Sequence, residues 1–330
     1  MLDYLTRRLL WAVGMFLAVT VFVFVIFWVV PVNPAALNGG NATPQLLHNR
    51  EHLMGTDRPL PVQYARFVWN LVAHGTLGHS FSNRRDVNRT VLDAAPITAS
   101  LVVGGALLWM LIALPVGILS ALRPRSLLDR VAMTFALVGI SAHPVWIGLM
   151  LSYFLGFRLG WFPITGYCDF IDPAKGQTCG GPTQWMYHLL LPWVTFAALY
   201  AALYVRMVRA SVLETLTADW VTTARAKGAS FMQVLRGHVL RNALLPVVTM
   251  FGMDIAVALG GSLFVENVWS LPGLGQTALE SLQQRDLPTT QGVVVFVAVA
   301  VIVLNLVVDA AYSVLDPRIM LSSDRRARSA

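Results

Sequence analysis

Long stretches almost free of charged residues recur along this chain, and they constrain its fold more than any other feature. Each has about the 20 apolar residues that a helix needs to cross a bilayer. Charged residues make up 12% of the chain, about half their share in an ordinary soluble domain, so lipid must cover much of its surface. The sequence therefore predicts an all-α integral membrane protein with six transmembrane helices. The apolar runs are Leu9–Val30, Ile97–Leu122, Val131–Phe157, His188–Val205, Leu244–Val265 and Leu287–Val308.

The lysines and arginines gather on one side of these predicted spans. Six spans place both termini on the same side, and 15 of the 24 Lys and Arg residues fall in segments that share that side. Because short cytoplasmic loops are enriched in positive charge, we predict cytoplasmic N- and C-termini. The net charge of +7 thus reflects topology, and we expect no nucleic-acid partner. The segments are 1–8, 123–130, 206–241 and 315–330.

The segment 31–96, between the first two runs, is predicted to be an extracytoplasmic insertion with a helix of its own. Pro61 suits the first turn of that helix, and Tyr64, Phe67 and Leu71 follow at helical spacing. The insertion either packs as a cap on the ends of the spans or helps to receive a docking protein or the substrate. The sequence leaves both roles open.

Two cysteines, Cys168 and Cys179, lie in one polar loop. Their spacing lacks the paired C-x-x-C pattern or the histidine partners of a zinc site, so we expect no metal site. If the loop faces an oxidising compartment, a disulfide between them is one alternative and two free thiols the other.

The segment 209–243, between the fourth and fifth runs, carries the most informative local pattern. Leu216, Trp220 and Ala224 recur every four residues, which predicts a helix with one apolar stripe. Gly228 suits the left-handed backbone position that ends such a helix. We therefore predict a sharp turn at this glycine, on the cytoplasmic face of the membrane.

A second short helix is predicted to begin at Ser230, with Gln233 completing a capping box. Small residues at the bend would let a partner's groove approach the backbone, and two cations flank them. A basic helix lying on anionic lipid is the alternative interpretation. A DNA-binding helix-turn-helix is disfavoured, because the segment is tethered between two spans. The small residues are Ala224, Ala226, Gly228 and Ala229, and the cations are Arg225 and Lys227.

Several short motifs, taken in order over nearly the whole chain, resemble one family. They are Thr223-Ala224-Arg225-Ala226-Lys227-Gly228-Ala229, Asp57–Tyr64, Leu77-Gly78-His79-Ser80, Gly260-Gly261-Ser262, Val265-Glu266, Pro272-Gly273-Leu274-Gly275 and Leu315-Asp316-Pro317-Arg318. The first resembles the EAA loop of ABC importer permeases. Together they resemble the B-type permease of the dipeptide/oligopeptide/nickel branch. This chain departs from the wider pattern in having Thr223 for an acidic residue and Arg241 for a proline.

The resemblance implies the six-helix fold of type I ABC importer permeases, as a single domain over 1–330 in the bacterial cytoplasmic (inner) membrane. It implies that a homologous second permease completes the translocation path. Two cytoplasmic ATPases and an extracytoplasmic substrate-binding protein would be the other partners. ATP and Mg²⁺ would bind to the ATPases, so we expect no cofactor and no catalytic residue in this chain. Di- and oligopeptides are the implied substrates, with nickel chelates, haem, glutathione and sugars left open.

The family's coupling element corresponds by position to part of the segment 209–243. The expected contacts with the ATPase are Asp219, Ala224, Arg225, Lys227, Gly228, Ala229 and Phe231. In and after the fifth run, a translocation path is expected at Asp254, Gly260, Gly261 and Glu266. A carboxylate at bilayer depth costs about 2.5–3.5 kcal/mol, so Asp254 should face an aqueous path or the protein interior. A structural, hydrogen-bonded aspartate is the alternative.

Two other functions are weaker alternatives. An ion-gradient-driven secondary transporter should carry polar residues in broken helices of both halves, and here Asp254 and the region of Gly273 lie in one half. A membrane hydrolase should carry a G-x-S-x-G or H-E-x-x-H motif, and neither occurs. The glycine- and proline-broken stretch Val265–Gly275 is expected to be either a re-entrant turn near a gate or a plain external loop.

Overall fold

The computed structural model describes residues 2–26, 59–171 and 179–315, and it confirms the predicted all-α class, since every element named within these ranges is helical. The last residues of the first run, positions 31–58 of the insertion and the motif at 316–318 lie outside the described residues. The chain forms two compact units, and each is described by itself. Unit 1 comprises Met1–Ile97 and Gly273–Ala330, and unit 2 comprises Thr98–Pro272.

Among the described residues, five helices are long and apolar enough to cross a membrane, and a bent pair of helices makes a sixth candidate. Their number agrees with the six predicted runs. Several extend beyond the predicted run because polar residues at their ends continue the same helix. The five are Thr6–Phe24, Val87–Leu122, Pro182–Leu216, Leu245–Trp269 and Leu287–Val308.

The third predicted run is not one straight helix. It consists of α6 (Leu127–Ser141) and α7 (Pro144–Leu151), which continues as the π-helix η2 (Ser152–Arg158), and the two parts are bent by 107°. The bend lies at His143, which has an extended backbone because a residue before proline is driven out of the helical region. The His143 Nδ1 atom accepts a hydrogen bond of 3.3 Å from the Val145 N–H and so caps the new helix.

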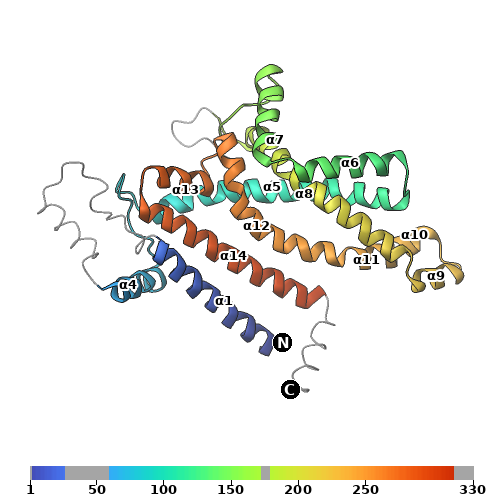
Figure 1. The fold of residues 1–330 in the computed structure, drawn as a ribbon, viewed down its shortest axis with the longest axis horizontal. Coiled ribbons are helices and arrows are strands. Elements are labelled where there is room, and N and C mark those ends of the chain that lie inside the picture. Colours follow the sequence, from blue (N-terminus) through green and yellow to red (C-terminus); the bar gives the residue numbers. More distant parts are fainter. Residues whose placement is uncertain (1, 27–58, 172–178, 316–330) are drawn as a thin grey trace, which may run out of the picture. The chain divides into compact units, whose positions relative to one another are not determined.

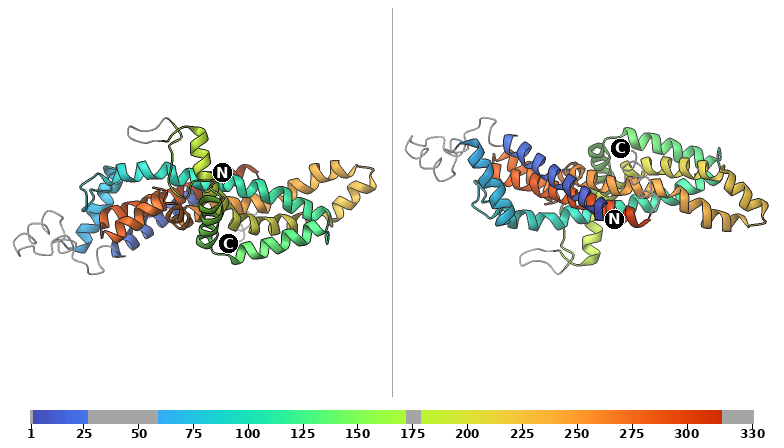
Figure 2. Two further views of the ribbon diagram at one scale, coloured as in Figure 1. Left: turned by 90° about the horizontal axis from the view of Figure 1, so that it is seen from above. Right: turned by 90° about the horizontal axis from the view of Figure 1, so that it is seen from below.

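Unit 1 brings the first and last spans together, and α1 and α14 run side by side in Figures 1 and 2. The predicted insertion helix is present as α4. The centres of its Tyr64 and Phe67 rings lie 5.4 and 6.4 Å from the centre of the Phe24 ring on α1. The hydroxyl oxygens of Tyr64 and Thr20 are 3.1 Å apart. The helices of unit 1 are α1 (Leu2–Phe24), α4 (Leu60–Ala73), the beginning of α5 (Val87–Leu122), α13 (Leu274–Gln283) and α14 (Leu287–Leu315).

Asp286 ties the motif Leu77-Gly78-His79-Ser80 to the beginning of α14 in this unit. Its buried carboxylate accepts hydrogen bonds from the Ser80 hydroxyl at 2.5 Å, the Phe81 N–H at 2.9 Å and the Thr289 hydroxyl at 2.7 Å. A buried carboxylate is tolerated when donors surround it in this way. The motif Leu77-Gly78-His79-Ser80 therefore contributes to the packing of unit 1, through the hydrogen bond from Ser80 to Asp286.

Unit 2 is built on close contacts between α5 and α8. A Cβ at Gly104 would lie 2.1 Å from the Trp193 ring, and one at Gly117 would lie 2.7 Å from Val208. Glycines thus let the two long helices approach, as small residues do at membrane helix interfaces. The elements of unit 2 are the rest of α5, α6, α7, η2, α8 (Pro182–Leu216), α9 (Asp219–Ala226), α10 (Phe231–Val234), η3 (Leu235–Val239), α11 (Leu240–Ala243) and α12 (Leu245–Trp269).

Candidate functional site

The predicted turn at Gly228 is present, between α9 and α10. We call residues 219–234 the elbow, and it extends beyond the other helices of unit 2 (Figures 1 and 2). Gly228 has φ +87°, its N–H donates to the Arg225 carbonyl at 3.0 Å, and the Ala229 N–H donates to the Ala224 carbonyl at 3.3 Å. A Cβ on Gly228 would meet no atom within 4 Å. The backbone conformation, and not crowding, is therefore what requires glycine here.

The capping box at the beginning of α10 is confirmed. The Ser230 hydroxyl accepts from the Gln233 N–H at 3.4 Å, and the Gln233 side-chain carbonyl accepts from the Ser230 N–H at 3.0 Å. Two backbone donors at the helix start are thereby satisfied within the elbow itself.

The predicted apolar stripe through Leu216, Trp220 and Ala224 is wrong at Leu216, which belongs to another helix. Leu216 is the last residue of α8, and α9 begins afresh at Asp219. The Thr217 hydroxyl donates to the Glu214 carbonyl at 2.9 Å, a local bond that competes with continuing the helix. Val221, rather than Trp220, is the buried residue of α9.

The underside of the elbow is apolar and packed, and it passes into α12 through a chain of short helices. Ser211 on α8 donates to the Ala243 carbonyl on α11 at 2.7 Å, so the two sides of the segment are tied together. The buried side chains are Val221, Val234, Leu235 and Val239.

The outer face of the elbow exposes large apolar side chains beside cations. Trp220, Phe231 and Met232 are 41, 49 and 50% exposed, and the Arg225 guanidinium lies 5.5 Å from the centre of the Phe231 ring. Asp219 and Lys227 are exposed, whereas Ala224 and Ala229 are partly buried. Tryptophan, phenylalanine, methionine and arginine are enriched in protein–protein interfaces, so this composition is typical of a docking surface.

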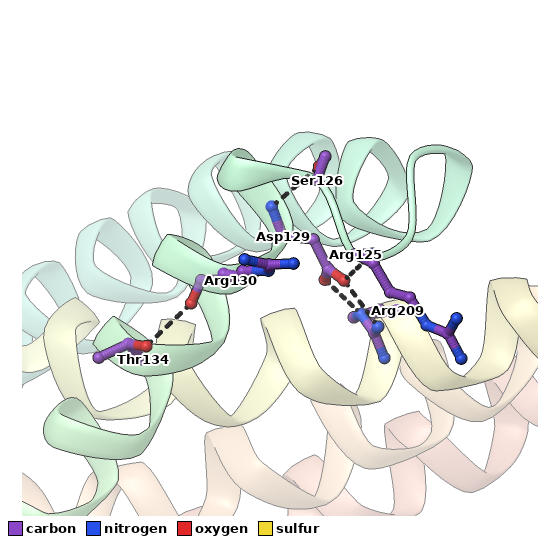
Figure 3. Close-up of polar contacts among 6 residues, drawn as sticks. All are labelled: Arg125, Ser126, Asp129, Arg130, Thr134 and Arg209. Carbon is purple, nitrogen blue, oxygen red and sulfur yellow. Dashed lines mark hydrogen bonds and ion pairs between the residues drawn. The ribbon is translucent and has the colours of Figure 1, made fainter.

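A partly buried ion pair, which the sequence did not reveal, lies at the beginning of α6 (Figure 3). Arg209 on α8 donates to both carboxylate oxygens of Asp129, from Nε at 2.5 Å and from Nη2 at 2.8 Å. The Arg125 N–H adds a third bond at 2.9 Å, and Ser126 caps the helix. We call Asp129 and Arg209 the clamp, because they join α6 to the part of α8 that leads to the elbow.

The four expected path residues all lie on α12, but the helix does not bring them together. Asp254 accepts a bond of 2.7 Å from the Tyr204 hydroxyl, whereas Glu266 is fully buried and accepts one of 2.7 Å from the Thr98 hydroxyl. At 100° per residue, Gly261 shares a face with Asp254, whereas Gly260 and Glu266 point elsewhere. A Cβ at Gly260 or Gly261 would meet nothing within 4 Å.

The stretch after the fifth run is less broken than expected. Glu266 and Asn267 belong to α12, which ends at Trp269, and their carbonyls accept from the N–H groups of Leu271 at 2.9 Å and Ser270 at 3.3 Å. Ser270 has φ +50°, and α13 begins at Leu274. The irregular part of Val265–Gly275 is therefore confined to the few residues between two helices.

The two cysteines are bonded to each other, with an S–S distance of 2.10 Å between Cys168 and Cys179. His188, which the sequence did not connect with them, lies with its Nδ1 atom 3.3 Å from the Cys168 sulfur. The same Nδ1 atom is 2.9 Å from the Gln184 carbonyl. The disulfide holds both sides of the 168–179 loop near the beginning of α8.

Comparison with known proteins covers almost the entire chain. Residues 113–321 match the family described as "Binding-protein-dependent transport system inner membrane component", and residues 1–102 match its N-terminal family. The chain is 35% identical to the di/tripeptide transport system permease protein DppB of Pseudomonas aeruginosa, over 97% of this chain and 99% of that one. It is 34% identical to a probable peptide ABC transporter permease protein of Sinorhizobium fredii, over 96% and 98%.

Proposed function

Because this chain belongs to the family of binding-protein-dependent transport system inner membrane components, we propose that it is the permease of a peptide importer and that a cytoplasmic ATPase binds its elbow. The chain is a multi-pass membrane protein with the type I ABC permease fold, and a transport component rather than an enzyme. ABC importers of this family generally work with ATPases and a binding protein. An ion-gradient-driven transporter is not favoured.

The observation that supports this proposal best is the contrast between the two faces of the elbow. Its underside is buried, so the elbow is fixed to unit 2, whereas Trp220, Phe231 and Met232 face outward in a short, bent element. An interfacial lipid anchor would present one continuous apolar face to the headgroups. The elbow instead turns sharply at Gly228 and carries cations at the bend. These features fit a protein groove better than a flat lipid surface.

The elbow is built to transmit motion to the spans. It joins α8 through the short break at Thr217 and Ala218, and it continues through η3 and α11 into α12. We infer that ATP binding draws the ATPases together, that the elbow moves with them, and that α8 and α12 then open the path outward. The clamp would carry the same motion to α6. Hydrolysis would return the path to its inward-facing state.

The full assembly that we propose has a homologous second permease, two ATPases and an extracytoplasmic binding protein. Both termini of this chain would be cytoplasmic, which follows from the distribution of lysines and arginines. Peptides are proposed as the substrate because the relatives named above are peptide permeases. ATP and Mg²⁺ would bind to the ATPases.

The proposal is tested by copurification of the ATPase with the tagged chain and by ATP-dependent peptide uptake into proteoliposomes. Phe231→Ser should weaken ATPase binding by about thirtyfold or more, so that little ATPase is recovered and uptake is lost, since a central aromatic anchor contributes on the order of 2 kcal/mol or more. Leu127→Ser is the matched control, because Leu127 is also an exposed apolar residue of unit 2 but lies outside the elbow. Full copurification and uptake with Phe231→Ser would contradict the proposal.

A further inference from the structure

Asp254 is a carboxylate well inside an apolar span. It lies nine residues after the beginning of α12, a distance of about 14 Å along the helix. The Tyr204 hydroxyl donates to its Oδ2 atom at 2.7 Å, and Oδ1 makes no hydrogen bond with the described residues. The side chain is partly exposed in this subunit. One oxygen is therefore fixed and the other is accessible.

Tyr204 holds this carboxylate in place from a rigid aromatic cluster. Tyr204 and Trp109 are both completely buried, with their rings 6.1 Å apart. Trp109 also stacks on Tyr200 at 4.5 Å and meets the edge of Phe251 at 5.8 Å. Since aromatic rings packed on several sides cannot swing away, the phenol positions Asp254 in advance of any ligand.

The surface around Asp254 is apolar and adaptable. Met250 lies four residues before Asp254 and Val257 three residues after it, so both share its face of α12. Met253 is the residue next to Asp254 in the sequence. Met253 and Val257 are 56 and 64% exposed. Lipid is an unfavourable cover for this face, because a carboxylate facing acyl chains costs about 2.5–3.5 kcal/mol. Methionine side chains are flexible and polarizable, and they are common at surfaces that bind many different partners.

We propose that Asp254, positioned by Tyr204, binds the α-ammonium group of a peptide during translocation; this inference rests on the peptide-permease function proposed above. Peptides of different sequence share one cationic amino terminus, whereas their side chains vary. A fixed carboxylate complements the constant group, because charge-assisted hydrogen bonds are the strong ones. The surface formed by Met250, Met253 and Val257 accommodates the variable side chains. Gly261 lies seven residues after Asp254 on the same face of α12, and a Cβ there would meet no atom within 4 Å, so the space beside it is open. Tyr204 acts as a positioning residue.

The first test is ATP-dependent uptake of a tripeptide into proteoliposomes that contain the complete transporter. Asp254→Asn should lower uptake of the tripeptide by about tenfold, which corresponds to loss of one charge-assisted contact. Tyr204→Phe keeps the ring on Trp109 and the carboxylate, so we expect a loss of only about threefold. Asp254→Glu keeps the charge and should restore part of the uptake. If Asp254→Asn and Tyr204→Phe lowered uptake by the same factor and also lowered the thermal midpoint by the same amount, the bond between these residues would be purely structural and the inference would be overturned.

The second test uses a photoreactive amino acid at Val257 in a chain that keeps Asp254, so that it does not depend on the folding of a charge variant. The probes are the tripeptide and its N-acetylated form, at concentrations that saturate the binding protein equally. The free peptide should crosslink to α12 about tenfold more than the acetylated one. Equal crosslinking would overturn the inference. If the peptide-permease function itself were wrong, the unmodified assembly would show no ATP-dependent uptake of the tripeptide, a result that is seen before any variant is compared.

Discussion

The elbow and the clamp lie in the same unit, yet they differ in what holds them. The elbow is formed by bonds between residues no more than five positions apart, around Gly228 and the Ser230 cap, and its outer face is exposed. The clamp joins two residues 80 positions apart, a buried carboxylate and a guanidinium that is only partly exposed. The clamp is therefore complete within this chain, whereas the elbow presents groups that only a partner could cover. The clamp should therefore matter mainly for stability and the elbow mainly for coupling to a partner, so the two can be perturbed separately.

Breaking the clamp should have the largest effect on stability. Asp129→Ala leaves the partly exposed Arg209 guanidinium without its counterion and its two hydrogen bonds, and we expect a loss of roughly 2–3 kcal/mol in the free energy of unfolding. Thermal unfolding of the purified chain measures it. Arg130→Ala, at the exposed neighbouring position on α6, is the control and should change little. The double change Asp129→Leu with Arg209→Met should recover most of the loss, and a single variant no worse than the control would contradict this view of the clamp.

Substitution of Gly228 should have the next largest effect. It should change the coupling of ATP hydrolysis to peptide uptake more than the free energy of unfolding of the whole chain. Gly228→Ala places a side chain at φ +87°, which costs about 1–2 kcal/mol locally. Gly237→Ala is a close control, since a Cβ there also meets nothing within 4 Å but the backbone is helical. ATP hydrolysed per peptide imported should rise for Gly228→Ala and stay unchanged for Gly237→Ala. If both variants hydrolysed the same amount of ATP per peptide imported, the geometry of the turn at Gly228 would have no role in coupling.

Removing the cap of α10 should have a smaller, strictly local effect. Ser230→Ala loses the capping box, and we expect a cost of about 1 kcal/mol confined to the elbow. Hydrogen exchange of the amides at 231–233 should become faster, while exchange in α8 and the thermal midpoint of the whole chain stay as they are. Slower or unchanged exchange at those amides would count against the cap.

Arg225 should have the smallest effect on the fold. Its contact with the Phe231 ring is exposed and is expected to contribute about 0.5 kcal/mol. Arg225→Ala should therefore leave thermal unfolding almost unchanged but weaken ATPase copurification, because the cation lies on the docking face. A stability loss as large as that of Asp129→Ala would mean that the elbow is a structural element like the clamp.

The sequence predicted the features whose chemistry is local. The turn at Gly228, the Ser230 capping box and the insertion helix with Pro61 in its first turn each depend on a few adjacent residues, and each is present. The stripe through Leu216 failed because the Thr217 hydroxyl ends α8 early. Pro144 was visible in the sequence, but the 107° bend beside it was not, because the size of a bend depends on neighbouring packing.

The bonds between distant residues could not be predicted from one sequence. Arg209–Asp129, Ser80–Asp286 and Tyr204–Asp254 join residues 80, 206 and 50 positions apart. Such pairs become visible only when the helices are packed, because no spacing rule relates side chains on different helices. The roles of Asp129 and Tyr204 were missed for this reason.

Docking of the ATPase on the elbow can be tested with a photocrosslinker in place of Met232, on the exposed face of the elbow, in the complete transporter embedded in lipid. We expect a crosslink to the ATPase subunit whose yield changes when ATP is added. Met253, exposed on α12 of the same unit, provides the control position and should give no ATPase crosslink. Crosslinking of position 232 to lipid alone, with and without ATP, would show that this elbow does not couple the permease to an ATPase.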